Sequence, residues 1–186
     1  MAYQGISGRS RSIGGFLAGM NLFVLRHGLA GEHGELGLAR DSERPLTPKG
    51  ERKLWRITQA MEEMELSFDV ILTSPYVRAR QTAEIVSEAF GLNKKLECTE
   101  HLTPSGSSKK LIDFIAALKP LPENVLLAGH EPYLSELISL LLTGETKASI
   151  LMKKGGLCKL SADALHHGRC ATLEWLLTPK QMCSIA

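Results

Sequence analysis

The sequence predicts an α/β fold, a three-layer α/β/α sandwich built around a mainly parallel sheet. Short apolar runs alternate along the chain with segments of helical periodicity, which is the pattern of βαβ units. The chain has 186 residues, of which 44% are hydrophobic and 23% charged. This length and composition suit one compact domain with a sizeable buried core.

The first strand is expected at residues 21–25, an apolar run that ends at Arg26-His27-Gly28. A polar loop then leads to Thr47, a residue type that caps helices, and to Pro48, which fits the first helical position. Because apolar residues then recur at helical spacing, we expect this helix to continue to about Glu65.

The remaining elements follow from apolar runs, helical periodicity and Gly or Pro stop signals. We expect further strands at residues 68–73, 96–98 and 124–128, and helices at residues 77–90, 107–118 and 133–142. Residues 156–160 and 171–176 are expected to form a terminal pair of antiparallel strands.

The charge balance argues against two classes of partner. Lys and Arg number 22 and Asp and Glu number 20, and the first 19 residues hold Arg9, Arg11 and no acid, so the rest of the chain has 20 of each sign. Proteins that bind nucleic acids or anionic membranes show a basic surplus. No stretch reaches the roughly 18 to 20 apolar residues needed to cross a bilayer. We therefore expect neither nucleic acid nor a membrane as a partner.

Residues 1–19 mix Gly, Ser and Arg without periodicity, and we interpret them as an expression leader before a single domain over residues 20–186. The alternative, a signal peptide, lacks a suitably placed small-residue cleavage site. The four cysteines are widely spaced and form no CxxC pair, which favours free thiols in a reducing, cytoplasmic environment.

Three of the expected strands end in residues suited to phosphoryl chemistry. Arg26 and His27 follow the first strand, Arg78 lies shortly after the second, and His130 follows the strand at 124–128. Ligands bind beyond the carboxyl ends of parallel strands, so these side chains should converge. Guanidinium groups match phosphate oxygens, and a neutral imidazole can attack phosphorus and carry the group covalently. Nearby cations disfavour protonation of that imidazole.

Four motifs carry a resemblance to a known family. They are RHG at 26–28, RPLT at 44–47, SPYVRARQTA at 74–83 and GHEP at 129–132. In this order and in these positions they resemble the histidine phosphatase superfamily, which has the phosphoglycerate mutase-like fold. Within it, the chain is most similar to SixA-type phosphohistidine phosphatases. The resemblance covers Met20 to about Met182.

The resemblance implies that His27 is the nucleophile that becomes phosphorylated and that Arg26 and Arg78 bind phosphoryl oxygens. It implies that His130 stabilises charge on the transferring group. Larger relatives carry a general acid on an inserted lid, and the short connections here leave no room for one. An open site suits a phosphorylated side chain on another protein, because a small metabolite is better held in an enclosed pocket.

The function expected on this basis is hydrolysis of phosphohistidine on a partner phosphotransfer or phosphorelay protein, through a covalent phosphohistidine on the enzyme. Two alternatives stay open: a small-molecule phosphomonoesterase of the same superfamily, and a catalytically weak module that binds phosphohistidine. No Cys is followed six positions later by Arg, and neither a phosphate-binding loop GxxxxGK[ST] nor a carboxylate-rich metal cluster occurs. We therefore expect a phosphatase without metal or cofactor.

Whether the site has a general acid stays open, with Asp41, Glu32 and His33 as candidates and no acid as the fourth possibility. The favoured role of Asp41 is an ion pair with Arg40 or Arg44 that orders the loop after His27.

Other polar residues are expected to have structural roles. Glu131 either orients an arginine or caps the helix that follows it. His101 is expected to be structural, and His166 and His167 to lie in a turn. Arg80 should point to a different side of its helix from Arg78 and contact solvent or a partner.

Overall fold

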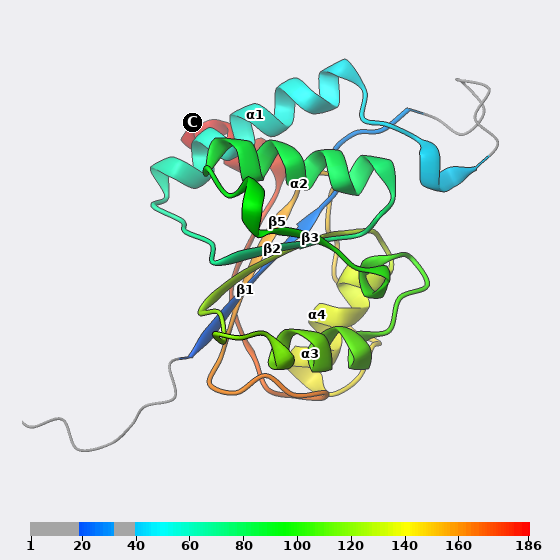
Figure 1. Cartoon of the computed structure of the whole chain (residues 1–186), viewed down its shortest axis with the longest axis vertical. Coiled ribbons are helices and arrows are strands. Elements are labelled where there is room, and N and C mark those ends of the chain that lie inside the picture. The colour runs from blue at the N-terminus through cyan, green and yellow to red at the C-terminus, as the bar shows by residue number, and fades with distance from the viewer. Residues whose placement is uncertain (1–18, 32–39) are drawn as a thin grey trace, which may run out of the picture.

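The structure, a computed structural model, describes residues 19–31 and 40–186. A six-stranded sheet lies between two helical layers (Figure 1), which confirms the predicted three-layer architecture. The strands are β1 (Met20–Arg26), β2 (Val70–Thr73), β3 (Leu96–Cys98), β4 (Asn124–Gly129), β5 (Leu157–Ala162) and β6 (Thr172–Leu177). The helices are α1 (Pro48–Glu63), α2 (Val77–Ala89), α3 (Ser108–Ala117), α4 (Tyr133–Thr143) and α5 (Pro179–Ile185), with short 3-10 helices η1 (Asp41–Glu43), η2 (Asn93–Lys95) and η3 (Glu100–Leu102). Apart from Gly19, the expected leader lies outside the described residues.

The strand order is β3-β2-β4-β1-β5-β6, and the pairs among the first four strands are all parallel. Only β5 runs against its neighbours β1 and β6, so the sheet is mainly parallel, as predicted. Arg26 of β1 pairs in register with Gly129 of β4, and Thr73 of β2 pairs with Ala128. The segments that follow β1, β2 and β4 therefore begin side by side at the carboxyl ends of these strands.

Alternate side chains of the central strands enter two separate cores. Leu22 and Val24 of β1 pack on the side of α3 and α4, whereas Phe23 and Leu25 pack on the side of α1, α2 and α5 (Figure 1). All four are at most 3% exposed, and β4 alternates in the same way. A strand buried on both faces reads as a continuous apolar run, which is why NLFVL and NVLLA predicted these strands.

Helix α1 begins as predicted, because the Thr47 hydroxyl accepts a hydrogen bond from the Gly50 amide at 3.0 Å and Pro48 takes the first helical position. It ends at Glu63, two residues earlier than expected. Glu65 has a φ of 54°, and this left-handed conformation turns the chain out of the helix.

Two further differences concern element boundaries. Phe68 was expected to start a strand, but β2 begins at Val70, and Phe68 instead packs edge-on against Phe23 with ring centroids 5.1 Å apart. Helix α5 was not predicted at all. Its signal is nevertheless present, since Thr178 and Gln181 form a capping box around Pro179.

We predict that Gly50→Ala destabilises the protein. A methyl group at Gly50, in the first turn of α1, would overlap the Leu29 backbone carbonyl. The substitution should lower the free energy of unfolding by about 2 kcal/mol, although Gly to Ala in an open helix raises it by about 0.5 to 1 kcal/mol.

Chemical denaturation measures this change, with Gln59→Ala on the exposed side of α1 as the control. A stabilised Gly50→Ala protein would contradict the close approach of α1 to the loop that follows His27.

Candidate active site

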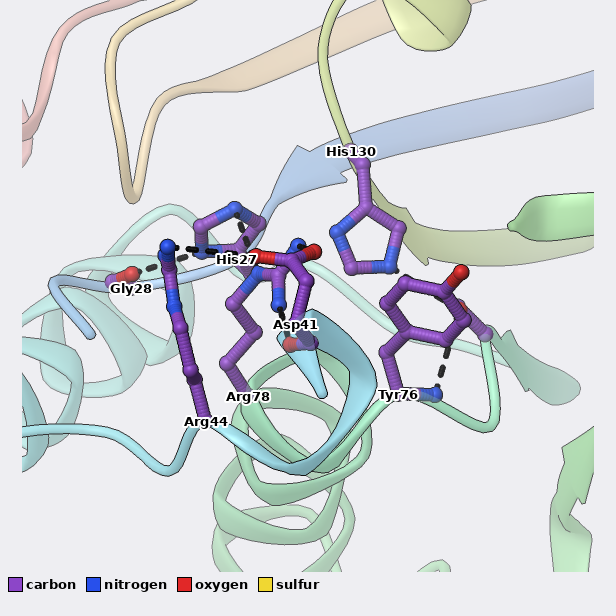
Figure 2. Close-up of polar contacts among 8 residues, drawn as sticks. His27, Gly28, Asp41, Arg44, Tyr76, Arg78 and His130 are labelled. Atoms are coloured by element: carbon purple, nitrogen blue, oxygen red, sulfur yellow. Dashed lines mark hydrogen bonds and ion pairs between the residues drawn. The ribbon is translucent and has the colours of Figure 1, made fainter. Parts of the chain in front are cut away.

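The structure brings the four predicted site residues together at the carboxyl edge of the sheet. The backbone amide of His27 donates to the Gly129 carbonyl at 3.0 Å, which fixes the loops after β1 and β4 beside each other. The rings of His27 and His130 lie 5.1 Å apart, and Arg78 approaches His27 from the first turn of α2 (Figure 2). Arg26 ends β1 itself.

A hydrogen bond to the backbone fixes the tautomer of His27. Its Nδ1 lies 2.7 Å from the Gly28 carbonyl oxygen. A carbonyl oxygen only accepts, so Nδ1 carries the proton, and in the neutral ring Nε2 keeps its lone pair. Arg78 Nε donates to Nε2 at 3.3 Å, so the Nε2 edge of the ring points toward a positive charge.

The surroundings of His27 keep its ring neutral. Burial lowers the pKa of His27 from 6.5 to about 3, and the charges of Arg78 and Arg26 act in the same direction. The hydrogen bond to the Gly28 carbonyl opposes this shift. At neutral pH, His27 therefore presents an unprotonated Nε2, the form that acts as a nucleophile.

Arg78 is held by Asp41 as well as by His27. Its Nη2 lies 2.8 Å from Asp41 Oδ2 and its Nη1 donates to the Asp41 carbonyl at 2.6 Å. Arg44 Nη1 reaches the other carboxylate oxygen of Asp41 at 3.1 Å (Figure 2). Hydrogen bonding to Arg78 and the two guanidinium charges hold the pKa of Asp41 below its ordinary value, against the effect of burial. The carboxylate is thus ionised at neutral pH.

Arg26 is anchored at one end of its guanidinium. Nη1 donates to the Met152 carbonyl at 2.7 Å, in the segment that leads to β5. Burial lowers the pKa of Arg26, while the Glu131 carboxylate raises it and the charge of Arg78 lowers it further. An arginine keeps its charge in such surroundings, so Arg26 adds a fixed positive charge beside His27.

His130 is positioned by residues that follow β2. Its Nε2 lies 2.9 Å from the Ser74 hydroxyl, and the Tyr76 ring packs at 5.0 Å from its ring. Tyr76 also lies under the Arg78 guanidinium, 5.4 Å from ring centre to Cζ. Burial and Arg78 lower the pKa of His130 to about 4, so it too is neutral at neutral pH.

Buried nitrogens without partners gather around His27. Among the described residues, four buried side-chain nitrogen or oxygen atoms lack a hydrogen bond, and three of them are Arg26 Nε, Arg44 Nε and His130 Nδ1. Buried polar groups normally find partners, and each one left unpaired costs about 1 to 3 kcal/mol. An anion with several acceptor oxygens would satisfy such a set of nitrogens.

Two motif residues on α2 hold the loops around the site. The Gly28 amide donates to the Thr82 hydroxyl at 3.0 Å, and the Leu46 amide donates to Gln81 Oε1 at 2.8 Å. Thr82 in turn donates to the Arg78 carbonyl at 2.7 Å. Gln81 and Thr82 of the SPYVRARQTA segment therefore fix the loops that surround Arg78, the first arginine of the same segment.

The acidic residues Asp41 and Glu131 have partners that agree only in part with the sequence-based expectations. Asp41 pairs with Arg44, as expected, but its ion pair with Arg78 was not anticipated. Glu131 caps α4, with its carboxylate accepting from both the amide and the hydroxyl of Ser135. Glu32 and His33 lie outside the described residues.

The remaining histidines and Arg80 lie away from His27. The His101 ring packs 6.2 Å from the Phe114 ring, and His167 lies 3.4 Å from the Ser108 hydroxyl. Arg80 points outward, as the helical spacing predicted, and it pairs with Glu84 at 3.3 Å, which was not expected.

Arg44, Ser74 and Tyr76 are pocket residues that the sequence did not predict. All three stand in motifs that the sequence displays, but periodicity does not reveal which side chains of an irregular segment point inward.

Neither a spanning helix nor a metal cluster occurs in the part of the chain that the structure describes. Over residues 19–31 and 40–186, none of the helices has the length and apolar character that crossing a membrane requires. In the same residues, no three His, Cys, Asp or Glu side chains are grouped so that they could hold a metal ion.

Comparison with known proteins decides the family. Residues 22–103 match the model of the histidine phosphatase superfamily (branch 1). The chain is 35% identical over 128 residues to the phosphohistidine phosphatase SixA homolog of Haemophilus influenzae, which is 64% of this chain and 76% of that protein. This chain belongs to the histidine phosphatase superfamily.

The similarity extends over nearly the whole fold. Phosphohistidine phosphatase SixA of Escherichia coli is 29% identical over 161 residues, covering 86% of this chain and 94% of that protein. The solved structure of the protein histidine phosphatase SixA complexed with tungstate superposes with a TM-score of 0.73 and 26% identity, covering 87% of this chain and 98% of the other. The predicted phosphoglycerate mutase-like fold is thereby confirmed.

We predict that the protein loses stability on mild acidification. Because folding lowers the pKa values of His27 and His130 to about 3 and about 4, the unfolded chain binds more protons below pH 6.5 than the folded chain does. The free energy of unfolding should fall by about 2 kcal/mol for each histidine between about pH 7 and pH 5.

Urea denaturation at the two pH values measures this loss. His27→Gln should recover about half of it, since the unfolded and folded forms of that variant no longer differ in protonation at this position. An equal loss in the variant and the wild type would contradict the neutral state of His27.

Proposed function

We propose that this protein is a phosphohistidine phosphatase that removes the phosphoryl group from a histidine of a partner protein, with His27 as the nucleophile. The observation that carries the proposal is the pair of contacts on the His27 ring: Nδ1 bound to the Gly28 carbonyl and Nε2 facing the Arg78 guanidinium. The similarity to phosphohistidine phosphatase SixA of Escherichia coli and to its homolog in Haemophilus influenzae supports phosphohistidine as the substrate class.

In the first step, the lone pair of His27 Nε2 attacks phosphorus. The bond between phosphorus and the substrate imidazole breaks as the bond to Nε2 forms. If the second nitrogen of the substrate ring carries a proton, the ring leaves as neutral imidazole. This leaving group needs no proton from the enzyme, whereas an alkoxide needs one.

In the second step, water attacks phospho-His27 and releases phosphate, and the Nε2 lone pair is restored. Arg26 and Arg78 bind the phosphoryl oxygens in both steps, supported by the contact of Arg78 with His27. His130, whose ring lies 5.1 Å from that of His27 and whose Nδ1 has no partner among the described residues, adds a further donor. Fixed donors of this kind stabilise the transition state because they need no reorganisation as charge develops. Tungstate, a tetrahedral oxyanion like phosphate, is bound by the related SixA.

Asp41 is a poor candidate for a general acid in this scheme. Its carboxylate is ionised and shared between Arg78 and Arg44, so it has no proton to donate at neutral pH. Its contact with Arg78 instead aligns that guanidinium beside His27. The cations at the site provide the positive charge that a metal supplies in other phosphatases, which supports a metal-independent reaction.

We predict that the enzyme prefers phosphohistidine on protein. Phosphate release from a histidine-phosphorylated phosphotransfer protein should exceed release from a phosphoserine peptide and from a sugar phosphate by at least about 100-fold in kcat/KM, because only imidazole leaves without a general acid. EDTA should leave the rate unchanged. Preference for the sugar phosphate would instead indicate a small-molecule phosphomonoesterase, and binding without release would indicate a recognition module.

We also predict that two arginines of α2, only two residues apart, behave differently. Arg78→Ala should lower kcat/KM for phosphohistidine by about 10²- to 10³-fold, because it removes a fixed donor at the reacting group. Arg80→Ala, which removes an exposed arginine paired with Glu84, should stay within about twofold of the wild type. Equal losses in the two variants would contradict the role assigned to Arg78.

A further inference from the structure

Helix α1 carries a row of cations on one side. Lys49, Arg52, Lys53 and Arg56 follow the i, i+3, i+4, i+7 spacing of a single helix face, and all four are exposed. With a rise of about 1.5 Å per residue, the row is about 10 Å long. Glu51, the acid of α1 nearest to these cations in sequence, lies on the opposite side of the helix from this row.

The row lines two adjoining hollows. One, of about 230 Å³, lies between the start of α1 and the segment before β5, and the other lies between α1 and α5, which pack together (Figure 1). The residues that line them include no Asp or Glu. We call their six cations the basic face: Lys49, Arg52, Lys53, Arg56, Lys154 and Lys180.

The basic face begins beside the nucleophile. Gly28, whose carbonyl holds His27 Nδ1, lines the smaller hollow together with Lys49 and Lys154. The amide of Gly155, the residue after Lys154, donates to the carbonyls of Arg26 and His27 at 3.0 and 3.1 Å. A molecule that reaches His27 from this side therefore passes along lysine side chains.

Within residues 19–31 and 40–186, the positive charge of the basic face has no acidic partner. In the described parts of the chain, none of its six members forms an ion pair with a carboxylate, and the one hydrogen bond from its side chains is that of Arg56 to the Cys183 carbonyl. Residues 20–186 nevertheless contain 20 cations and 20 acids, so the positive charge is a local concentration. Such a patch attracts a partner with the opposite charge.

Exposed leucines flank the same approach. Leu29, in the wall of the smaller hollow, is 37% exposed, and Leu151, which precedes the Met152 carbonyl bound by Arg26, is 73% exposed. Aliphatic side chains gain from contact with a protein surface, whereas phosphate backbones offer them nothing to pack against.

We propose that the basic face is the docking surface for the phosphorylated partner, and that this partner carries carboxylates around its phosphohistidine. This inference rests on the proposed function and adds the chemistry by which the substrate protein is selected. Lysines at the rim of an interface act mainly on the association rate, so the effect should appear in KM and weaken at high salt.

Two synthetic phosphohistidine peptides test the proposal, one with Glu and Asp flanking the phosphohistidine and one with Gln and Asn in their place. Free phosphohistidine serves as a substrate too small to reach the basic face. At low salt, the wild type should favour the acidic peptide by about tenfold in kcat/KM, with the difference in KM. The double variant Lys49→Glu/Lys53→Glu should lose this preference and hydrolyse free phosphohistidine at the wild-type rate.

The matched control is Lys94→Glu/Lys95→Glu, the same change of charge on two exposed lysines of η2. These lysines directly precede β3 and therefore lie at the amino ends of the parallel strands, whereas His27 lies at the carboxyl ends. The control should keep the preference for the acidic peptide. An unchanged preference in Lys49→Glu/Lys53→Glu, equal loss in the control, or a wild type without preference would overturn the proposal. A loss on free phosphohistidine would assign these lysines to catalysis and would overturn it as well.

A binding measurement separates this proposal from the proposed function. If the wild type hydrolyses neither peptide nor free phosphohistidine, the proposed function fails. The fluorescently labelled peptides without phosphate then still test the basic face, which must bind the acidic form more tightly. Duplex DNA and phosphatidylserine vesicles serve as competitors for the labelled peptide. If either displaces it at a lower concentration of negative charges than the unlabelled acidic peptide requires, the partner is not a protein and the proposal is overturned.

Discussion

The hydrogen bond between His27 Nδ1 and the Gly28 carbonyl governs the chemistry available at this site. It places the proton on the buried side of the ring and leaves the Nε2 lone pair toward Arg78. The bond needs Gly28 in a fixed position, and that position depends on the Thr82 hydroxyl and on β4, whose Gly129 carbonyl holds the His27 amide. The His27 ring is thus oriented by a loop carbonyl that the buried sheet and α2 hold in place.

A second constraint is the crowding of positive charge around that ring. Arg26, Arg78 and Arg44 gather within one pocket, and Asp41 is the acid that bridges two of them. Bringing guanidinium groups together without an anion is unfavourable, and the unpaired nitrogens show that part of this cost remains in the protein alone. A phosphoryl group bound as proposed would relieve it, so substrate binding and the stability of the pocket would be coupled. The burial of the ring and the same charges hold the His27 pKa at about 3, which keeps Nε2 unprotonated at neutral pH.

Much of this arrangement was predictable from the sequence, because the central strands are buried on both faces and end in polar residues. The strand ends at Arg26 and at the residue before Ser74 locate the pocket, and the Thr47-Pro48 cap locates α1. The pairing of Asp41 with Arg44 was predicted, but its contact with Arg78 was not predictable. Asp41 lies in a short 3-10 helix without periodicity, and its partner Arg78 is 37 residues away in the chain. The basic row of α1 is readable from spacing, but its junction with Lys154 and Lys180 arises only when α5 and the segment before β5 pack beside it.

The proposed reaction requires that His27 carry a phosphoryl group during turnover. Rapid quenching of the protein during turnover of a histidine-phosphorylated protein, followed by peptide mass spectrometry at neutral to basic pH, measures this directly. We predict a transient phosphate on His27 that is stable in base and lost in acid, and no label in a His27→Ala protein, while His101→Ala accumulates it as the wild type does. Turnover with phosphate on another residue, or undiminished turnover in His27→Ala, would contradict His27 as the residue that carries the phosphoryl group.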